Sequence, residues 1–432
     1  MRGNKDGGNM SEDKKGKILV VGGGIAGIST ALEASEAGYD VIVVEKSAYL
    51  GGRVAQFNQY FPKLCPPYCG LEINFRRLRA NPNVTIYTQA ELETVEGSAG
   101  AFQISIKVNP RYVNNRCVSC DDCAQVCPVE RDNDFNYGMD KTKGIYLPHE
   151  LAYPMRYVLD KEVCQGDSCK KCVEACKYNA IDLSMKPESV TDTVSSIVFA
   201  TGWIPYDATN PKMDNLGFGK YKNIITNVMM ERLAAKNGPT GGKIVTPGDG
   251  KEINSIAFVQ CAGSRDENNL PYCSAICCLA SLKHSAMVRE QYPDAQIYIF
   301  YIDLRAPGKY EIFYQRFQED PKITLIKGKI AKITEDSSTG SLIVEGEDTE
   351  NAKKVKAQVD MVVLATGMEP STVKDKIPVV VSHDEFGFII PDPNKPGIYS
   401  AGVARRPGDV ARSVQTATSA ALNAIQHAIG GK

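Results

Sequence analysis

Two groups of four closely spaced cysteines constrain this chain more than any other feature. The first group is Cys117, Cys120, Cys123 and Cys127. Its C-x2-C-x2-C-x3-C spacing, followed by a proline, lets three thiolates hold one iron–sulfur cube while the fourth reaches a second cube. The second group has a slightly longer first gap and comprises Cys164, Cys169, Cys172 and Cys176.

Together the two groups predict a two-cluster ferredoxin module over residues 111–180, with two 4Fe–4S clusters. Cross-ligation would pair Cys117, Cys120 and Cys123 with Cys176, and Cys164, Cys169 and Cys172 with Cys127. Structural zinc and disulfides are the alternatives. Zinc needs only two C-x2-C pairs per site, and fourteen cysteines without a secretion signal favour metal ligation over disulfides.

A glycine-rich turn near the N-terminus predicts a dinucleotide site. Residues 17–21 (KILVV) read as a strand, residues 28–37 read as a helix, and Gly22, Gly24 and Gly27 lie between them. Such glycines permit a tight turn, close approach to a pyrophosphate and close packing of helix on strand. A second strand over residues 40–44 ends in Glu45, where a carboxylate takes ribose hydroxyls.

Several later segments favour FAD over NAD. Residues 50–53 (LGGR) resemble the second glycine segment of two-dinucleotide-domain flavoproteins. Strands at 197–202 and 361–367 end in Ala-Thr-Gly, as at the domain crossovers of those proteins, and a strand at 397–402 precedes a helix near 410–428. Val403 replaces the acid that contacts the flavin ribitol there, and a backbone amide could substitute. The predicted FAD-binding residues are Gly22, Gly24, Ile25, Ala26, Gly27, Glu45, Lys46, Gly51, Gly52, Arg53, Leu92, Ala200, Thr201, Gly202, Gly402 and Val403.

A second dinucleotide fold has lost its phosphate-binding turn. Residues 255–260 read as its first strand, and residues 296–302 read as another strand that ends at Asp303. The first strand is followed by Cys-Ala-Gly-Ser-Arg (261–265) instead of a glycine-rich phosphate-binding motif. We therefore expect no direct use of NAD(P)H.

Further cysteines surround that turn. They are Cys261, Cys273, Cys277 and Cys278. They are either buried thiols, which behave as small apolar side chains, or ligands of a third 4Fe–4S cluster. Cys65 and Cys69, in a proline-rich loop, are either a redox-active pair near the flavin, ligands shared with a partner, or buried thiols.

Overall composition excludes several function classes. A net charge of −1 gives no electrostatic footprint for nucleic acid. No apolar run approaches the ~18 residues of a membrane span. Residues 1–14 are polar, lack a signal-peptide core and are expected to be disordered. A cytoplasmic protein is expected.

The chain resembles the flavoprotein family of heterodisulfide reductase A subunits. Its ferredoxin lies within a flavin frame, and the segments CAGSRD (261–266) and YCSAICC (272–278) match the family. The resemblance implies that the third cysteine group binds a cluster and that Lys283 lies near flavin N5. The compact form and the run CPPYCGLE (65–72) most resemble the A subunit of the quinone-interacting membrane-bound oxidoreductase complex of sulfate reducers.

The expected fold is an α/β, thioredoxin-reductase-like flavoprotein with Rossmann-type domains and a ferredoxin insert. The FAD-binding domain would comprise residues 15–110, 181–210 and 360–432, and the degraded nucleotide domain residues 211–359. The resemblance implies an electron-transfer subunit between a membrane quinone module and adenylylsulfate reductase, held at the membrane by a second flavin and iron–sulfur subunit together with a haem subunit. Alternatives are a soluble heterodisulfide-reductase-type subunit with electron bifurcation, and a free-standing disulfide oxidoreductase using Cys65 and Cys69.

Overall fold

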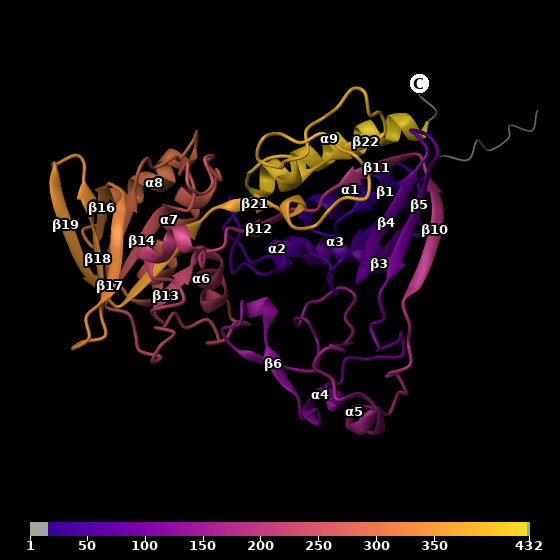
Figure 1. Cartoon of the computed structure of the whole chain (residues 1–432), viewed down its shortest axis with the longest axis horizontal. Coiled ribbons are helices and arrows are strands. Elements are labelled where there is room, and N and C mark those ends of the chain that lie inside the picture. The colour runs from indigo at the N-terminus through magenta and orange to yellow at the C-terminus, as the bar shows by residue number, and fades with distance from the viewer. Residues whose placement is uncertain (1–15, 430–432) are drawn as a thin grey trace, which may run out of the picture.

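Two five-stranded parallel sheets, one in each half of the molecule, organise the fold (Figure 1). The structure is a computed structural model that describes residues 16–429. The expectation for residues 1–14 lies outside the described residues. Within the described part, no helix is both long and apolar enough to cross a bilayer.

The first sheet carries the N-terminal glycine turn. Its strands, in spatial order, are β22 (Ile398–Ser400), β11 (Ser196–Phe199), β1 (Ile18–Val21), β2 (Val41–Glu45) and β3 (Val84–Thr88). Helices α1 (Ile25–Glu36) and α9 (Val410–Ala428) pack against each other and the sheet. The short α2 (Gly52–Ala55) and α3 (Tyr68–Ala80) follow β2. The β2 sequence VIVVE is buried throughout, as expected for a central parallel strand. Helix α1 begins at Ile25 rather than at residue 28 as predicted, because Gly27 joins its first turn.

A small antiparallel sheet covers the other face of the first sheet. It is formed by β4 (Ala90–Glu96), β5 (Phe102–Val108) and β10 (Glu188–Val194). Alternate β5 residues Phe102, Ile104 and Ile106 pack in one core cluster with Leu19 and Phe199. Alternate side chains of β5 therefore point toward the parallel sheet and fill the core between the two sheets.

We call the part of the molecule built on this first sheet the first unit, and the part built on the second parallel sheet the second unit. The second unit repeats the architecture of the first. Its parallel strands, in spatial order, are β13 (Ile224–Thr226), β20 (Met361–Thr366), β14 (Ser255–Ala262), β15 (Gln296–Tyr301) and β16 (Ile323–Lys327). Its helices are α6 (Asn227–Ala234), α7 (Cys277–Gln291) and α8 (Tyr310–Gln318). Its antiparallel sheet comprises β17 (Ile330–Glu335), β18 (Leu342–Asp348) and β19 (Lys353–Val359).

One predicted domain boundary is wrong. The sequence-based prediction begins the last FAD-domain segment at residue 360, but β20 lies between β13 and β14 in the second sheet. The chain leaves the second unit only after Thr366. The two connections between the units pair with each other. Their strands, β12 (Trp203–Pro205) and β21 (Met368–Pro370), form an antiparallel pair.

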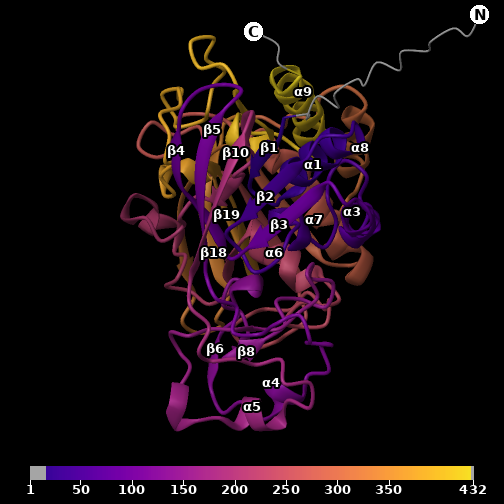
Figure 2. The ribbon, with the colours of Figure 1, turned by 90° about the vertical axis from the view of Figure 1, so that its right-hand side faces the viewer.

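The cysteine-rich insert projects from the first unit as a separate lobe (Figures 1 and 2). It contains only short elements: α4 (Asp122–Gln125), β6 (Glu130–Asp132), β7 (Lys141–Lys143), β8 (Ile145–Tyr146), β9 (Val158–Leu159) and α5 (Lys171–Ala175). Its small core includes Cys123 and Cys172 among its buried members. A core this small is usually reinforced by metal or disulfides.

Arg232 joins all three parts of the molecule. It lies on α6, is fully buried, and its guanidinium stands 4.6 Å from the ring centroid of Phe135 in the insert. Its Nε donates to Asn136 Oδ1 at 2.7 Å, and its Nη1 donates to the carbonyl of Gln56 at 3.2 Å. One buried cation therefore fixes the second unit against both the first unit and the insert.

Arg232→Ala is expected to lower the free energy of unfolding by on the order of 3 kcal/mol. The change leaves buried acceptors unpaired and opens a cavity. Urea unfolding followed by far-UV circular dichroism measures it. The control is Arg76→Ala, because Arg76 is exposed and pairs with Glu72 on the surface of α3, so its effect should stay below about 1 kcal/mol. Equal shifts for both variants would contradict the role of Arg232.

Candidate flavin and iron–sulfur sites

A cavity of about 550 Å³ lies where the first unit, the second unit and the insert meet. Its volume falls in the range of about 300–1,000 Å³ typical of cofactor sites. The first unit contributes the β1–α1 turn, the end of β2 and the Ala-Thr-Gly turn after β11. The second unit contributes α6 and α7, and the insert contributes Arg131, Phe135 and Tyr146.

The glycine turn leaves its backbone open to this cavity. Gly22 has φ +108°, and a Cβ there would lie 2.3 Å from the carbonyl oxygen of Ala200, so only glycine fits. A Cβ at Gly24 would meet nothing closer than Gly52 Cα at 3.9 Å. The backbone at Gly24 is therefore accessible, and the N-terminus of α1 directs its free N–H groups to the same place.

Glu45 closes one side of the cavity. Its Oε2 accepts from the Gly23 N–H at 2.6 Å and its Oε1 from the Ser47 N–H at 2.6 Å. Burial raises the pKa of Glu45, and these N–H groups act against that rise. Thr201 Oγ1, also in the cavity wall, is buried without a hydrogen-bond partner among the described residues. The open glycine backbone, the buried carboxylate and the unpartnered hydroxyl fit the phosphate and ribose groups of FAD.

Most of the predicted FAD residues line this cavity. They are Gly22, Gly24, Ile25, Ala26, Glu45, Lys46, Gly52, Arg53, Ala200, Thr201, Gly202 and Val403. Gly27, Gly51 and Gly402 instead shape the surrounding backbone. A Cβ at Gly27 would lie 1.8 Å from the Gly22 carbonyl oxygen, while Gly51 and Gly402 have φ of +111° and +65°.

Leu92 is the one predicted FAD residue that belongs neither to the cavity wall nor to the turns around it among the described residues. It lies on β4, where it packs against the core cluster under the antiparallel sheet, and it is not part of the cavity wall. Conversely, no sequence motif indicates that Arg131, Phe135 and Tyr146 of the insert line the cavity. The insert thus forms part of the wall of the flavin site as well as carrying cysteines.

Lys283 lies in the cavity wall, on the same helix as Cys277 and Cys278. Its Nζ is in contact with Glu231 Oε1 and donates to the carbonyl of Gln59 at 2.5 Å. The family resemblance identified Lys283, but sequence reasoning missed Glu231. Helix α6 carries no motif that marks this acid, which is recognisable only by its burial beside a cation.

The insert brings the crossed set of cysteines together. Cys127, Cys164, Cys169 and Cys172 line one small cavity. Cys117, Cys123 and Cys176 belong to the insert core, which Cys127, Cys164 and Cys172 share. Cys120 is exposed on a turn with positive φ at Ser119 and Asp121. Backbone N–H groups of Gly166 and Ala180 donate to the sulfurs of Cys164 and Cys176 at 3.4 and 3.3 Å. Such N–H groups tune cluster potentials.

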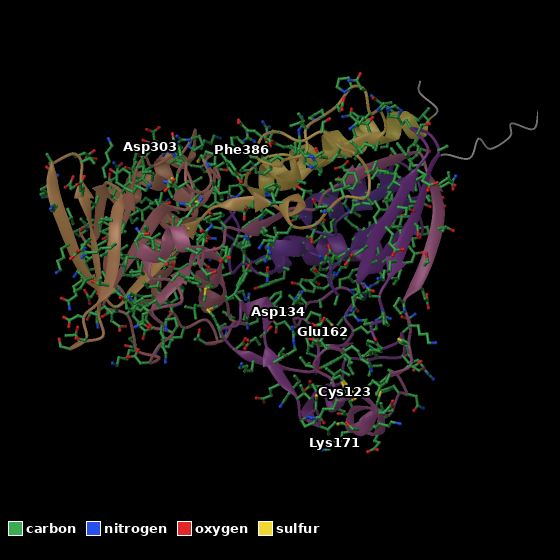
Figure 3. The ribbon with its side chains drawn as sticks, viewed as in Figure 1. Cys123, Asp134, Glu162, Lys171, Asp303 and Phe386 are labelled. Carbon is green, nitrogen blue, oxygen red and sulfur yellow. The ribbon has the colours of Figure 1, made fainter. Side chains whose placement is uncertain are left out.

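The third cysteine group also converges. Cys261, Cys273, Cys277 and Cys278 line a small cavity at the end of β14, together with Ser264 and Arg265. The Ala275 N–H donates to Cys273 Sγ at 3.3 Å. Figure 3 labels Asp303, whose carbonyl accepts from Cys278 Sγ at 3.4 Å, in the lobe opposite to Cys123. The candidate cluster positions therefore lie in different lobes of the molecule.

Burial disfavours the charged form of two of these thiols, Cys261 and Cys123. Burial and the neighbouring thiolates raise the pKa of Cys261 to about 11 and that of Cys123 to about 12. Among residues 16–429, no three or more Cys, His, Asp or Glu side chains are arranged to hold a single metal ion. A 4Fe–4S cube holds its four thiolate ligands further apart than a single metal ion does, so this observation does not bear on the cluster prediction.

Cys65 and Cys69 do not line the cavity. Cys65 shares a hydrogen bond with the phenol of Tyr60, and burial together with this contact raises the pKa of Tyr60 to about 12. Cys69 is exposed in the first turn of α3. A dithiol that acts directly on the flavin is therefore not favoured.

Cys277→Ala is expected to remove about four iron atoms per chain. Cys277 is buried beside the other three thiols, so its loss opens one corner of the third candidate cluster. Iron analysis of anaerobically purified protein measures the effect. Cys65→Ala is the control and should leave iron unchanged. Unchanged iron in Cys277→Ala would mean that the third group consists of structural thiols.

Comparisons with known proteins agree with this geometry. The model of the FAD-dependent oxidoreductase family matches residues 17–147. The second iron-sulfur A subunit of the CoB–CoM heterodisulfide reductase of Methanopyrus kandleri is 40% identical over 97% of this chain and 65% of its own length. The A subunit of the H(2):CoB-CoM heterodisulfide,ferredoxin reductase of Methanothermobacter thermautotrophicus is 36% identical over 96% of this chain and 64% of its own length. The chain thus spans just under two thirds of the length of these relatives.

Solved structures match the fold. Thioredoxin reductase of T. acidophilum superposes with a TM-score of 0.51 at 15% identity, covering 96% of this chain and 100% of that protein. Thioredoxin reductase of Lactococcus lactis gives a TM-score of 0.52 at 14% identity over the same shares. At these identities the likeness concerns the fold alone.

The fold and the glycine-lined cavity define a thioredoxin-reductase-like flavoprotein of the FAD-dependent oxidoreductase class. Within that class, the chain is a flavoprotein like the heterodisulfide reductase A subunits, to which it is 36–40% identical over 93–97% of its length.

Proposed function

We propose that this chain is the FAD and iron–sulfur electron-transfer subunit of a heterodisulfide-reductase-type complex. One observation carries the proposal: a single helix, α7, begins with Cys277 and Cys278 of the third cysteine group and continues into the wall of the flavin cavity. Electrons could thus pass between FAD and a cluster along one element, without a diffusible nucleotide. FAD exchanges electron pairs, and clusters carry single electrons.

The second unit supports electron delivery without nicotinamide. The turn after β14 is filled by side chains, because a Cβ at Gly263 would lie 2.5 Å from Tyr206 and 2.8 Å from Met213. Cys261 stands at this turn with φ +54°. A nicotinamide cofactor would need an open glycine backbone there. We therefore propose that the third 4Fe–4S cluster replaces the lost nucleotide.

The proposed arrangement also suits branching of electrons at the flavin. Two candidate cluster positions lie in the insert and one lies in the second unit, with the flavin cavity at the junction. The relatives are heterodisulfide reductase subunits, which favours this complex type over the quinone-linked complex that the sequence-based prediction placed first. Adenylylsulfate reductase and a membrane haem subunit are the partners expected of the quinone-linked complex. The subunits that co-purify with this chain would distinguish the quinone-linked complex from the heterodisulfide-reductase-type complex.

The experiment is anaerobic rapid mixing of the purified full chain, loaded with its cofactors and free of other subunits, with two kinds of reductant. We expect titanium(III) citrate, a one-electron donor, to bleach the flavin absorbance, while NADH and NADPH leave it unchanged over seconds. Fast bleaching by either nicotinamide would overturn the proposal, because it would require a working nucleotide site in the second unit.

A further inference from the structure

A buried acid–base group lines the flavin cavity behind Lys283. Glu231 accepts at Oε2 from the Asn58 N–H at 3.0 Å, and its Oε1 contacts both Lys283 Nζ and His284 Nε2, the latter at 2.6 Å. The side chains of these three residues are no more than 5% exposed. A carboxylate, an ammonium and an imidazole therefore share one buried site in the cavity wall.

His284 is the member of this group with spare proton-binding capacity. Its Nδ1 is buried and has no hydrogen-bond partner among the described residues. Its ring stacks on the uncharged ring of Phe258 in β14, and the two ring centroids are 6.2 Å apart. Burial lowers the pKa of His284, whereas Glu231 acts in the opposite direction. The imidazole is thus neutral near pH 7 and is held by a carboxylate that would stabilise its charged form.

The charge balance of this group determines how the cavity responds to an added electron pair. Glu231 and Lys283 neutralise each other, so the group carries no surplus charge. The charged groups that face His284 are Glu231 from α6 and Lys283 from α7, and the segment at residues 58–59 contributes only backbone. A new negative charge in a buried cavity is costly unless a nearby group takes up a proton.

We propose that His284 is a proton-accepting residue that becomes charged when FAD in this cavity is reduced. The inference rests on the proposed function, because it requires FAD at this site. FAD held here would supply the two-electron chemistry: on reduction it would gain two electrons, one at a time from clusters or from a reductant, and one proton. His284 Nδ1 takes a second proton from solvent. Two protons are therefore bound for each electron pair.

His149 provides a matched control. It is also a buried histidine with an unpartnered nitrogen, Nε2, and it stacks on Phe135 near the cavity. Its charged neighbour, however, is Arg232, and burial together with this cation lowers its pKa to about 4. A histidine that faces a cation has no reason to take up a proton when the flavin is reduced.

The test measures the flavin midpoint potential of the native complex at several pH values between about 7 and 8. One proton per electron pair changes the potential by ~30 mV per pH unit, and two protons double that slope. We expect the doubled slope in wild type and in His149→Gln. His284→Gln keeps an amide that can donate to Glu231 but cannot titrate, so its slope should fall to the single value.

A second readout does not depend on the variant folding. Infrared difference spectra of wild type with isotope-labelled histidine should show a neutral-to-charged imidazole change on reduction of the flavin. A wild type that binds FAD but shows the single slope and no imidazole band would overturn this inference while leaving the proposed function intact. A wild type that binds no FAD would overturn both.

Discussion

Replacing Glu45 by lysine is expected to weaken FAD binding at least ~100-fold, which corresponds to about 2.7 kcal/mol. The carboxylate is buried at the end of β2 and holds the backbone N–H groups of Gly23 and Ser47. Lysine would leave both donors unpaired and would place a cation among the N–H groups of the phosphate turn. Fluorescence titration of the flavin-free protein with FAD measures the change.

Two further variants separate charge from hydrogen bonding at Glu45. Glu45→Gln keeps one acceptor oxygen for a backbone N–H and introduces no positive charge, so we expect less than about a tenfold loss. Glu96→Lys, at the exposed far end of β4, makes the same charge change outside the cavity wall and should have no effect. Unchanged affinity in Glu45→Lys would show that FAD does not use this acid.

Paired cysteine substitutions in the insert test the crossed ligation. Cys127 and Cys164 line the same small cavity, so replacing both with alanine removes one cluster and about four iron atoms. Replacing Cys117 and Cys164 instead opens both clusters and removes about eight. Iron and sulfide analysis, with electron paramagnetic resonance of the reduced protein, distinguishes the two double variants.

Two other results would contradict the crossed ligation. If Cys127 belonged with the first group in sequence, Cys127→Ala with Cys164→Ala would lose about eight iron atoms. Stoichiometric zinc with little iron in the wild type would exclude clusters from the insert altogether. Both outcomes would contradict the crossed grouping of the insert cysteines.

Local sequence patterns predicted much of this fold. The runs KILVV and VIVVE became central parallel strands, and the glycines between them became the turn at the cavity, because strand burial and tight turns depend on neighbouring residues. The helix at 410–428 was predicted at its observed bounds. Cysteine spacing predicted the crossed grouping in the insert; one of its two sets lines a common small cavity, and the ligation itself stays a prediction.

Features that depend on distant contacts could not be predicted in this way. The strand at Met361–Thr366 reads like the strand before the first crossover, and only its pairing with β13 and β14 places it in the second unit. Leu92 was assigned to the cofactor, but it is half-buried on β4 and packs against the core cluster beneath the antiparallel sheet. Arg232 and Glu231 look like ordinary surface charges of a helix, and their roles arise from burial between units.

The most direct test of a flavin and iron–sulfur electron carrier is the cofactor content of the anaerobically purified native protein. Flavin released by denaturation, together with iron, sulfide and zinc, would be measured per chain. We predict one non-covalently bound FAD and about twelve iron atoms, with no stoichiometric zinc. A protein without flavin, or with zinc in place of iron, would contradict this prediction.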